Sequence, residues 1–99
     1  GITGCWRVVQ MIADAGLTYC PHFLAGGIGL VASAQLLAAA AGDGLLEVDF
    51  NDNPLREELA KPYSQLVEGN FILNDAPGLG VEPDLAAVSD LRVQYAEIT

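Results

Sequence analysis

The stretch LTYCPHFLAGGIGLVASAQLLAAAAGDGLLEVDF, residues 17–50, decides the fold of this chain. It opens with a short run of β-forming residues that Pro21 closes, and it ends in a second such run over residues 45–50. Between them, a glycine-rich turn leads into an uncharged, alanine-rich helix over residues 28–41. The pattern predicts two parallel neighbouring strands joined by a helix that crosses over one face of the sheet.

Two polar residues of this unit are candidates for chemistry. His22, the only histidine of the chain, stands where the first strand should end, and Glu47 lies inside the second strand. Parallel α/β proteins place their chemistry beyond the carboxyl ends of strands, so this pair is a predicted site. A structural alternative stands beside each role: His22 could hydrogen-bond the backbone of a turn, and Glu47 could be an ordinary solvent-facing strand residue.

Composition bounds the class of protein. The chain has 99 residues, enough for one domain, and 52% of them are apolar against a typical ~45–50%. This excess indicates that some apolar surface faces protein or membrane. The net charge is −9, with only four Lys and Arg residues, which excludes a basic patch for nucleic acid or for an anionic membrane surface.

Cysteine usage and the chain start indicate a cytoplasmic protein. Cys5 and Cys20 form no C-x-x-C motif and no Cys/His ligand set, so a zinc site is not expected. We expect both thiols to be reduced and buried. The start of the sequence carries neither a basic region nor a cleavage site of the kind that marks a signal peptide.

Signals outside the central unit predict two further elements. Apolar residues at helical spacing follow Thr3, which is expected to cap a helix that Gly16 ends. Residues 65–68 and 71–73 are expected to pair as a hairpin around a Gly69-Asn70 turn.

Two other interpretations of the central helix are open. Residues 23–41 carry no charge and approach the ~20 residues of a membrane span, but alanine and glycine are only weakly apolar and basic flanks are missing. Gly27-x-Gly29-x-x-Ala32 imitates a dinucleotide fingerprint, yet residues 21–26 separate it from the strand. A weaker form of the nucleotide interpretation remains, in which the backbone N–H groups of this glycine turn hold a substrate carboxylate or phosphate.

Five short motifs follow one another in a familiar order: Gly1-Ile2-Thr3 before the Trp6 helix, Cys20-Pro21-His22-Phe23-Leu24, Leu45-Leu46-Glu47-Val48-Asp49, Asn53-Pro54-Leu55 and Pro77-Gly78-Leu79-Gly80-Val81. Together they resemble the C-terminal quarter of the enolase superfamily, of the mandelate racemase and muconate lactonizing enzyme type. The resemblance implies an α/β fold. Residues 1–54 would form the last two strands of a (β/α)₈ barrel with their helices. Residues 55–99 would form a tail with a β-hairpin that returns to a capping domain.

The resemblance also implies a chemistry. In that family, the histidine that ends the seventh barrel strand is a general base or acid beside a substrate carboxylate, and His22 matches it. A glutamate of the eighth strand donates a hydrogen bond to the forming enolate, and Glu47 matches it. A carbon acid of this kind needs its developing charge stabilised, and a buried, neutral carboxyl group can help to do so.

What the resemblance implies for the whole enzyme goes beyond these residues. Mg²⁺ would be bound by earlier strands that this chain lacks, so the chain alone is expected to be inactive. We expect an acid-sugar dehydratase, with a hydroxy-acid racemase or epimerase as the alternative. The competing class is a small non-enzymatic membrane or interaction module built on the helix of residues 23–41. The expected partners are a carboxylate substrate, the remaining barrel and capping domain, and further copies of the complete enzyme, in the cytoplasm, without nucleic acid or membrane.

Overall fold

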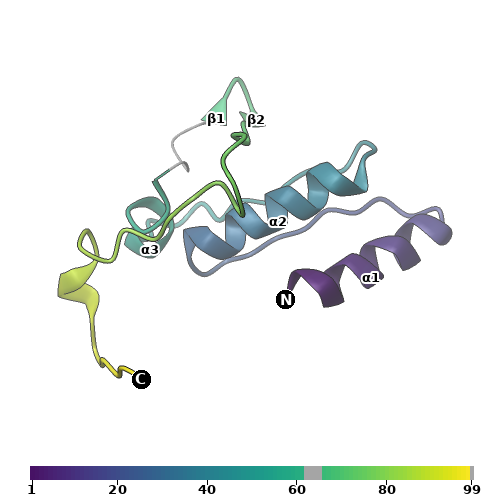
Figure 1. The fold of residues 1–99 in the computed structure, drawn as a ribbon. Coiled ribbons are helices and arrows are strands. Elements are labelled where there is room, and N and C mark those ends of the chain that lie inside the picture. Colours follow the sequence, from purple (N-terminus) through teal and green to yellow (C-terminus); the bar gives the residue numbers. More distant parts are fainter. Residues whose placement is uncertain (62–65, 99) are drawn as a thin grey trace.

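The computed structural model describes residues 1–61 and 66–98 (Figure 1). The described elements are α1 (Ile2–Asp14), α2 (Gly27–Ala40), α3 (Pro54–Glu57), β1 (Leu66–Val67), β2 (Asn70–Phe71) and a 3₁₀ turn, η2 (Ser89–Leu91). Helices α1 and α2 lie side by side, and in the view of Figure 1 the segment that joins them is seen between the two. The C-terminal tail runs away from this body.

Helix α1 ends where the sequence predicts but begins earlier. Gly16 has a φ of +68°, the left-handed conformation that ends a helix at little cost for glycine. The N–H of Leu17 then bonds the carbonyl of Ile12 at 3.0 Å. At the other end Gly1 takes the N-cap position without a side-chain bond, so the predicted Thr3 cap is wrong. Thr3 lies inside the first turn, because the helix already includes Ile2.

The parallel neighbourhood of the two segments is confirmed at a single bridge, but the predicted strands over residues 17–20 and 45–50 are not formed. His22 and Glu47 form an isolated parallel bridge, and the N–H of Glu47 donates to the carbonyl of Pro21 at 2.9 Å. Helix α2 makes the crossover between the two segments. The ladder stops at this one bridge, because the N–H of Leu45 meets the thiol of Cys20 at 3.5 Å in place of a backbone carbonyl.

The core is centred on α2. Its Leu30 is fully buried, at 0% exposure, and Val31, Ala34 and Leu36 are buried with it. A helix without charges is expected where protein covers it on several sides. Among the described residues, no helix reaches the length and apolarity that a membrane crossing requires.

The glycines of the central unit are explained by close packing. A Cβ at Gly29 would overlap the ring of Phe23, and one at Gly44 would overlap the carbonyl oxygen of Tyr19. Glycine at positions 29 and 44 therefore lets Phe23 pack on α2 and lets the two segments beside α2 approach each other. This explains the Gly27-x-Gly29 pattern without a bound nucleotide.

The hairpin is present, with its turn one residue earlier than predicted. Leu66 pairs with Phe71 and Val67 with Asn70, so the turn is Glu68-Gly69. Both turn residues have positive φ, +49° and +80°, as the tightest two-residue hairpin turn requires. The predicted Gly69-Asn70 turn is wrong because Asn70 belongs to the strand ladder. Gln65, at the start of the predicted first strand, lies outside the described residues.

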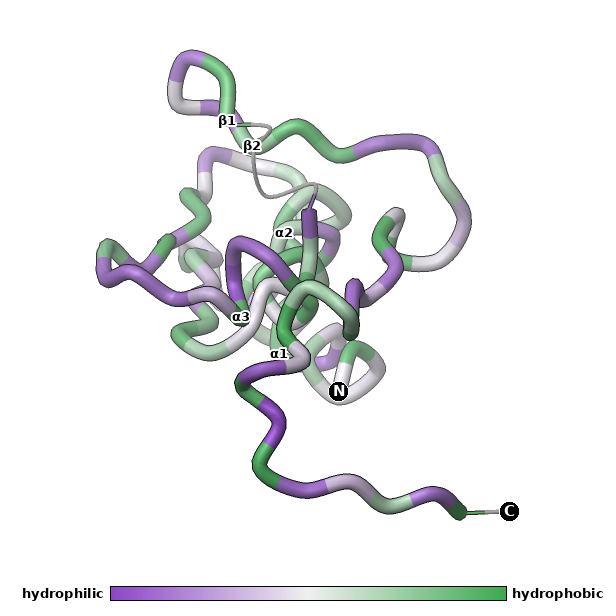
Figure 2. The backbone as a smooth tube through the Cα atoms, turned by 90° about the vertical axis from the view of Figure 1, so that its left-hand side faces the viewer, coloured by the Kyte–Doolittle hydropathy of each residue, from purple (hydrophilic) through white to green (hydrophobic). Residues whose placement is uncertain are grey.

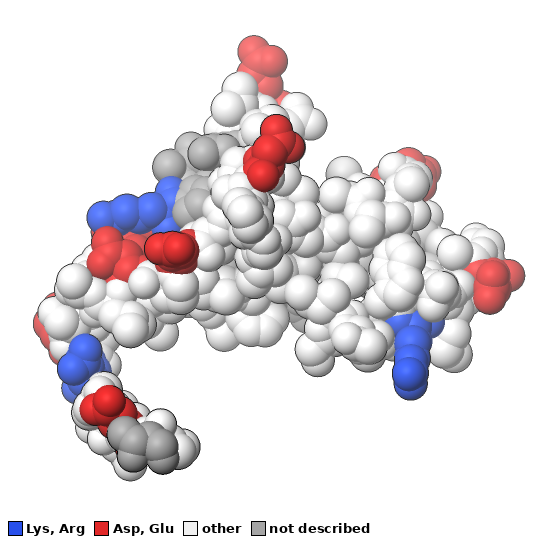
Figure 3. Space-filling model, in the orientation of Figure 1, with Lys and Arg blue, Asp and Glu red and all other residues white. Residues whose placement is uncertain are grey.

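Much apolar surface is uncovered in this chain. Cys5 and Cys20 are free thiols but exposed, so the predicted burial is wrong. Phe50 is 99% exposed. Apolar and polar residues alternate along the exposed tail (Figure 2), and charged side chains lie mainly at the edges of the face shown in Figure 3, leaving its centre uncharged. The chain carries apolar faces that its own residues do not cover; the closed barrel and the capping domain remain predictions.

Candidate active site

His22 and Glu47 come together in space although the helix α2 separates them in sequence. They are in-register partners of the parallel bridge, and residues in register on neighbouring strands direct their side chains to the same face. Both are exposed, whereas Leu46 and Val48 are half-buried beside α2. The alternation therefore places Glu47 on the face away from the helix.

This arrangement suits proton transfer. An imidazole titrates near neutral pH, so a histidine can take up a proton and release it again. A carboxyl group on the neighbouring segment offers a second hydrogen-bonding group on the same face. The structure thus brings together the two residues that the sequence singled out, on an open face where a small molecule can approach.

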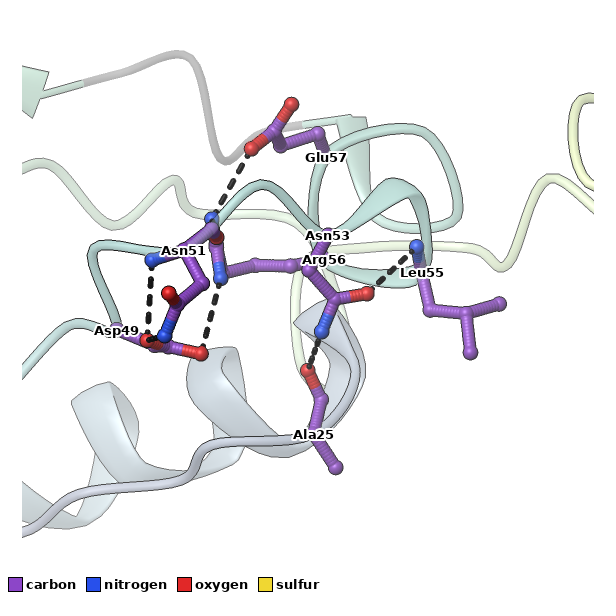
Figure 4. A network of polar contacts seen from close by, with 7 residues as sticks. All are labelled: Ala25, Asp49, Asn51, Asn53, Leu55, Arg56 and Glu57. Atoms are coloured by element: carbon purple, nitrogen blue, oxygen red, sulfur yellow. Dashed lines mark hydrogen bonds and ion pairs between the residues drawn. The ribbon is translucent and has the colours of Figure 1, made fainter.

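A buried arginine organises the loop that follows Glu47 (Figure 4). Arg56 is 3% exposed, and it donates hydrogen bonds to the carbonyl of Asn51 and, at 3.0 Å, to a carboxylate oxygen of Glu57. Its Nη1 lies 3.6 Å from Oδ2 of Asp49. The other carboxylate oxygen of Asp49 accepts from the backbone N–H and the side-chain amide of Asn51, at 3.1 and 2.7 Å.

These contacts favour the ionised form of Asp49. The backbone N–H of Asn51, then its side-chain amide, and then the Arg56 guanidinium hold the pKa of Asp49 below its usual value. Asp49 is thus bound into the loop that follows Glu47. Sequence reasoning missed Arg56; the available signal was a cation two residues after the Asn53-Pro54 pair.

A second contact joins this loop to the one that follows His22. Asn53 caps α3, with Oδ1 accepting from the N–H of Leu55 at 3.1 Å, and its Nδ2 donates to the carbonyl of Ala25 at 2.9 Å (Figure 4). A Cβ at Gly27 would overlap the carbonyl of Arg56 and lie 2.6 Å from the Cβ of Ala60. We call this contact region, made by residues 25–27 and 53–60, the α2–α3 junction.

A metal site is not formed by the described residues, since no three of their His, Cys, Asp and Glu side chains are arranged to hold an ion. The residues present therefore do not fit Mg²⁺, which needs several oxygen ligands in close to octahedral geometry. His22 and Glu47 remain candidates for acid–base chemistry.

Comparison with known proteins decides the family. The family model described as enolase C-terminal domain-like matches residues 1–88, which includes both His22 and Glu47. The chain belongs to the enolase C-terminal domain-like family. This confirms the resemblance to the enolase superfamily, and with it the α/β class of the fold.

Two curated relatives of this enolase-type chain are enzymes. It is 31% identical over 80 residues to arabinonate dehydratase of Saccharolobus solfataricus, covering 81% of this chain and 21% of that protein. It is 25% identical over 101 aligned positions to D-galactarolactone cycloisomerase of Agrobacterium fabrum, covering 94% of this chain and 27% of that protein. The chain thus spans about a quarter of the length of these relatives. No solved structure matches it.

Proposed function

We propose that this chain is the closing segment of an acid-sugar dehydratase, with His22 as the proton-transfer residue and Glu47 as the hydrogen-bond donor to the enolate. The observation that carries the proposal is the in-register parallel bridge between these two residues. Membership of the enolase superfamily and the similarity to an arabinonate dehydratase support it. The catalytic unit also needs barrel strands and a capping domain beyond these 99 residues, and the Mg²⁺ of this enzyme type would bind there.

The proposed roles account for every proton in a dehydration. His22 removes the proton from the carbon next to the substrate carboxylate, and the electron pair moves into an enolate. The carboxyl group of Glu47 donates a hydrogen bond to the enolate oxygen. The protonated His22 then gives its proton to the β-hydroxyl group, which leaves as water. The resulting enol becomes a keto acid when its β-carbon takes up a proton from solvent and its hydroxyl group releases one to solvent.

Isomerisation is the second candidate, favoured by the similarity to a cycloisomerase. It uses the same first proton transfer, but the substrate skeleton keeps all its oxygen atoms. Mass spectrometry of the product separates the two outcomes: a dehydratase product has lost one water, whereas an isomerase product has the mass of the substrate.

His22→Asn in the complete enzyme tests the proton-transfer role. With arabinonate and related sugar acids in D₂O, the variant should lose exchange of the α-proton and turnover by about 10²–10⁴-fold, because a missing base has no substitute. NMR of the substrate measures the exchange. Near-normal exchange would reject the role and leave the turn-stabilising alternative for His22.

Glu47→Gln tests the donor role. The amide keeps the shape of the side chain and can still donate a hydrogen bond, so turnover should fall less than in His22→Asn. Glu82→Gln, which changes an exposed acid of the tail in the same way, is the matched control and should leave turnover unchanged. Equal activity of the two glutamine variants would remove Glu47 from the mechanism.

A further inference from the structure

Asn53 bridges the two loops that follow the candidate catalytic residues. Its Nδ2 donates to the carbonyl of Ala25, three residues after His22, while Asn53 itself lies six residues after Glu47. The backbone pairing between the two segments is the isolated His22–Glu47 bridge. Past that bridge, the relative position of the two loops depends on side-chain contacts, of which this hydrogen bond is one (Figure 4).

Both ends of the Asn53 bond are held in place. On the side of Glu47, the buried Arg56 guanidinium holds the carbonyl of Asn51 and faces Asp49. On the side of His22, the backbone at Gly26 packs against α3: a Cβ added there would lie 3.5 Å from the carbonyl oxygen of Leu55, which is van der Waals contact. A hydrogen bond between two supported segments can transmit position, because neither segment yields easily when the other moves.

We propose that Asn53 is a positioning residue that couples the loop after His22 to the loop after Glu47, through the hydrogen bond from its Nδ2 to the Ala25 carbonyl. The coupling keeps the two side chains at a constant separation around the reacting carbon. This inference rests on the proposed function for its effect on the reaction, but the coupling itself is a property of the junction. A misplacement of about 1 Å can cost on the order of 10²-fold in rate, so a single loop contact can matter.

Asn53→Asp separates the coupling from the capping role of the same side chain. Aspartate still accepts from the N–H of Leu55 and is as good an N-cap as asparagine, but it has no N–H to donate to Ala25. Asn53→Ala removes both bonds. A merely structural cap therefore predicts an effect for Asn53→Ala alone, whereas the coupling predicts an effect for both.

The chain offers a closely matched control in Asn74. Its Oδ1 accepts from the N–H of Ala76 at 2.9 Å and its Nδ2 donates to the carbonyl of Gly80 at 2.8 Å. Asn74→Asp thus makes the same charge change and loses the same kind of bond, in the tail instead of at the junction.

The kinetic test compares these variants in the complete enzyme. We expect Asn53→Asp to lower kcat by about 10–100-fold with KM within about threefold, because positioning acts on the transition state more than on binding. Its melting temperature should equal that of Asn74→Asp, and Asn74→Asp should keep wild-type kcat. Equal kcat for the two aspartate variants, or a loss of activity that only follows the unfolded fraction, would overturn the proposal.

Hydrogen–deuterium exchange provides a readout that does not depend on activity. In Asn53→Asp, the backbone amides of residues 22–26 should take up deuterium faster than in wild type, and in Asn74→Asp they should not. Unchanged uptake in Asn53→Asp would overturn the coupling. If Asn53→Asp takes up deuterium faster at these amides but the wild-type enzyme exchanges no α-proton of a sugar acid, the proposed function is rejected and the coupling is retained.

Discussion

Two glycines of the unit of residues 17–57 and two of the part from residue 66 to the tail have different roles. In the first, Gly27 and Gly44 are pressed against backbone carbonyls, and a Cβ would collide with them. In the second, Gly69 and Gly78 have positive φ, and a Cβ on either would meet no atom of the described chain within 4 Å. At these four positions, glycine serves tertiary packing in the first unit and local turn conformation in the second. Gly42 and Gly80 do not follow this division: Gly42 has a φ of +101° and open space around it, and a Cβ at Gly80 would overlap the side chain of Asn74.

Polar contacts show the same difference. The bonds around Asn53 include one that spans 28 sequence positions, to Ala25. In the hairpin and the loop of residues 74–80, the side-chain amides of Asn70 and Asn74 reach carbonyls two and six positions away. One side-chain contact of that loop joins residues far apart in sequence: the side-chain amide of Gln35 donates to the carbonyl of Leu79 at 3.5 Å. The site candidates lie in the part that long-range contacts organise.

The largest effect is expected for Gly44→Ala. The new methyl group would overlap the carbonyl of Tyr19, and overpacking of this kind costs about 1–3 kcal/mol or more. Gly69→Ala, with open space but positive φ, should cost only about 1 kcal/mol. Denaturant unfolding of the complete protein measures both. If the two variants lose the same free energy of unfolding, the distinction between packing glycines and turn glycines is wrong.

The next effect is expected for Arg56→Met. The variant loses charge-assisted hydrogen bonds at the junction. Because Asn51 and Glu57 are exposed and regain water, we expect a net loss of about 1.5 kcal/mol, the lower end for hydrogen bonds to a charged group. Lys61→Met is the comparison, because Lys61 is exposed and lies 3.6 Å from Asp84, where a surface ion pair contributes about 0–1 kcal/mol. If both substitutions reduce the free energy of unfolding equally, the contacts of Arg56 at the junction contribute no more than a surface ion pair.

The pH dependence of stability should report on Asp49. Its pKa in the folded protein lies below the usual value, so its contribution is present near neutral pH and is lost as the pH falls below about 4. Asp49→Asn should therefore be less stable than wild type at pH 7, and this difference should shrink in acid. Unfolding curves at a series of pH values measure it. A difference that does not change with pH would reject the ionised role of Asp49.

The smallest effect is expected in the hairpin turn. Glu68 has a φ of +49°, which is strained for glutamate, and asparagine tolerates this conformation better. Glu68→Asn should raise the stability by a few tenths to about 1 kcal/mol, visible as a higher melting temperature. Glu82→Asn, outside the turn, should give no such gain. A loss in Glu68→Asn would show that the turn is set by contacts beyond its own backbone.

Local sequence signals predicted the elements that depend on neighbouring residues. Gly16 ends α1 as predicted, and the segments on either side of α2 are parallel neighbours, although their backbone pairing is limited to the bridge between His22 and Glu47. Errors of one residue, in the turn at Glu68-Gly69, and of two residues, in the cap of α1, arise where nearby positions are nearly equivalent by propensity. The residues His22 and Glu47 could be chosen from sequence because strand ends and titratable side chains are both visible there.

The sequence by itself therefore determined the helix of the central unit and the parallel direction of the two segments beside it, since these follow from periodicity, turn residues and β-forming residues acting over a few positions. Only the tertiary structure decided which side chains hold that unit together. The bond from Asn53 to Ala25 and the contact of Gly27 with Arg56 join residues far apart in the chain. Such contacts leave no short-range pattern, because their partners meet only after α2 has packed against α3.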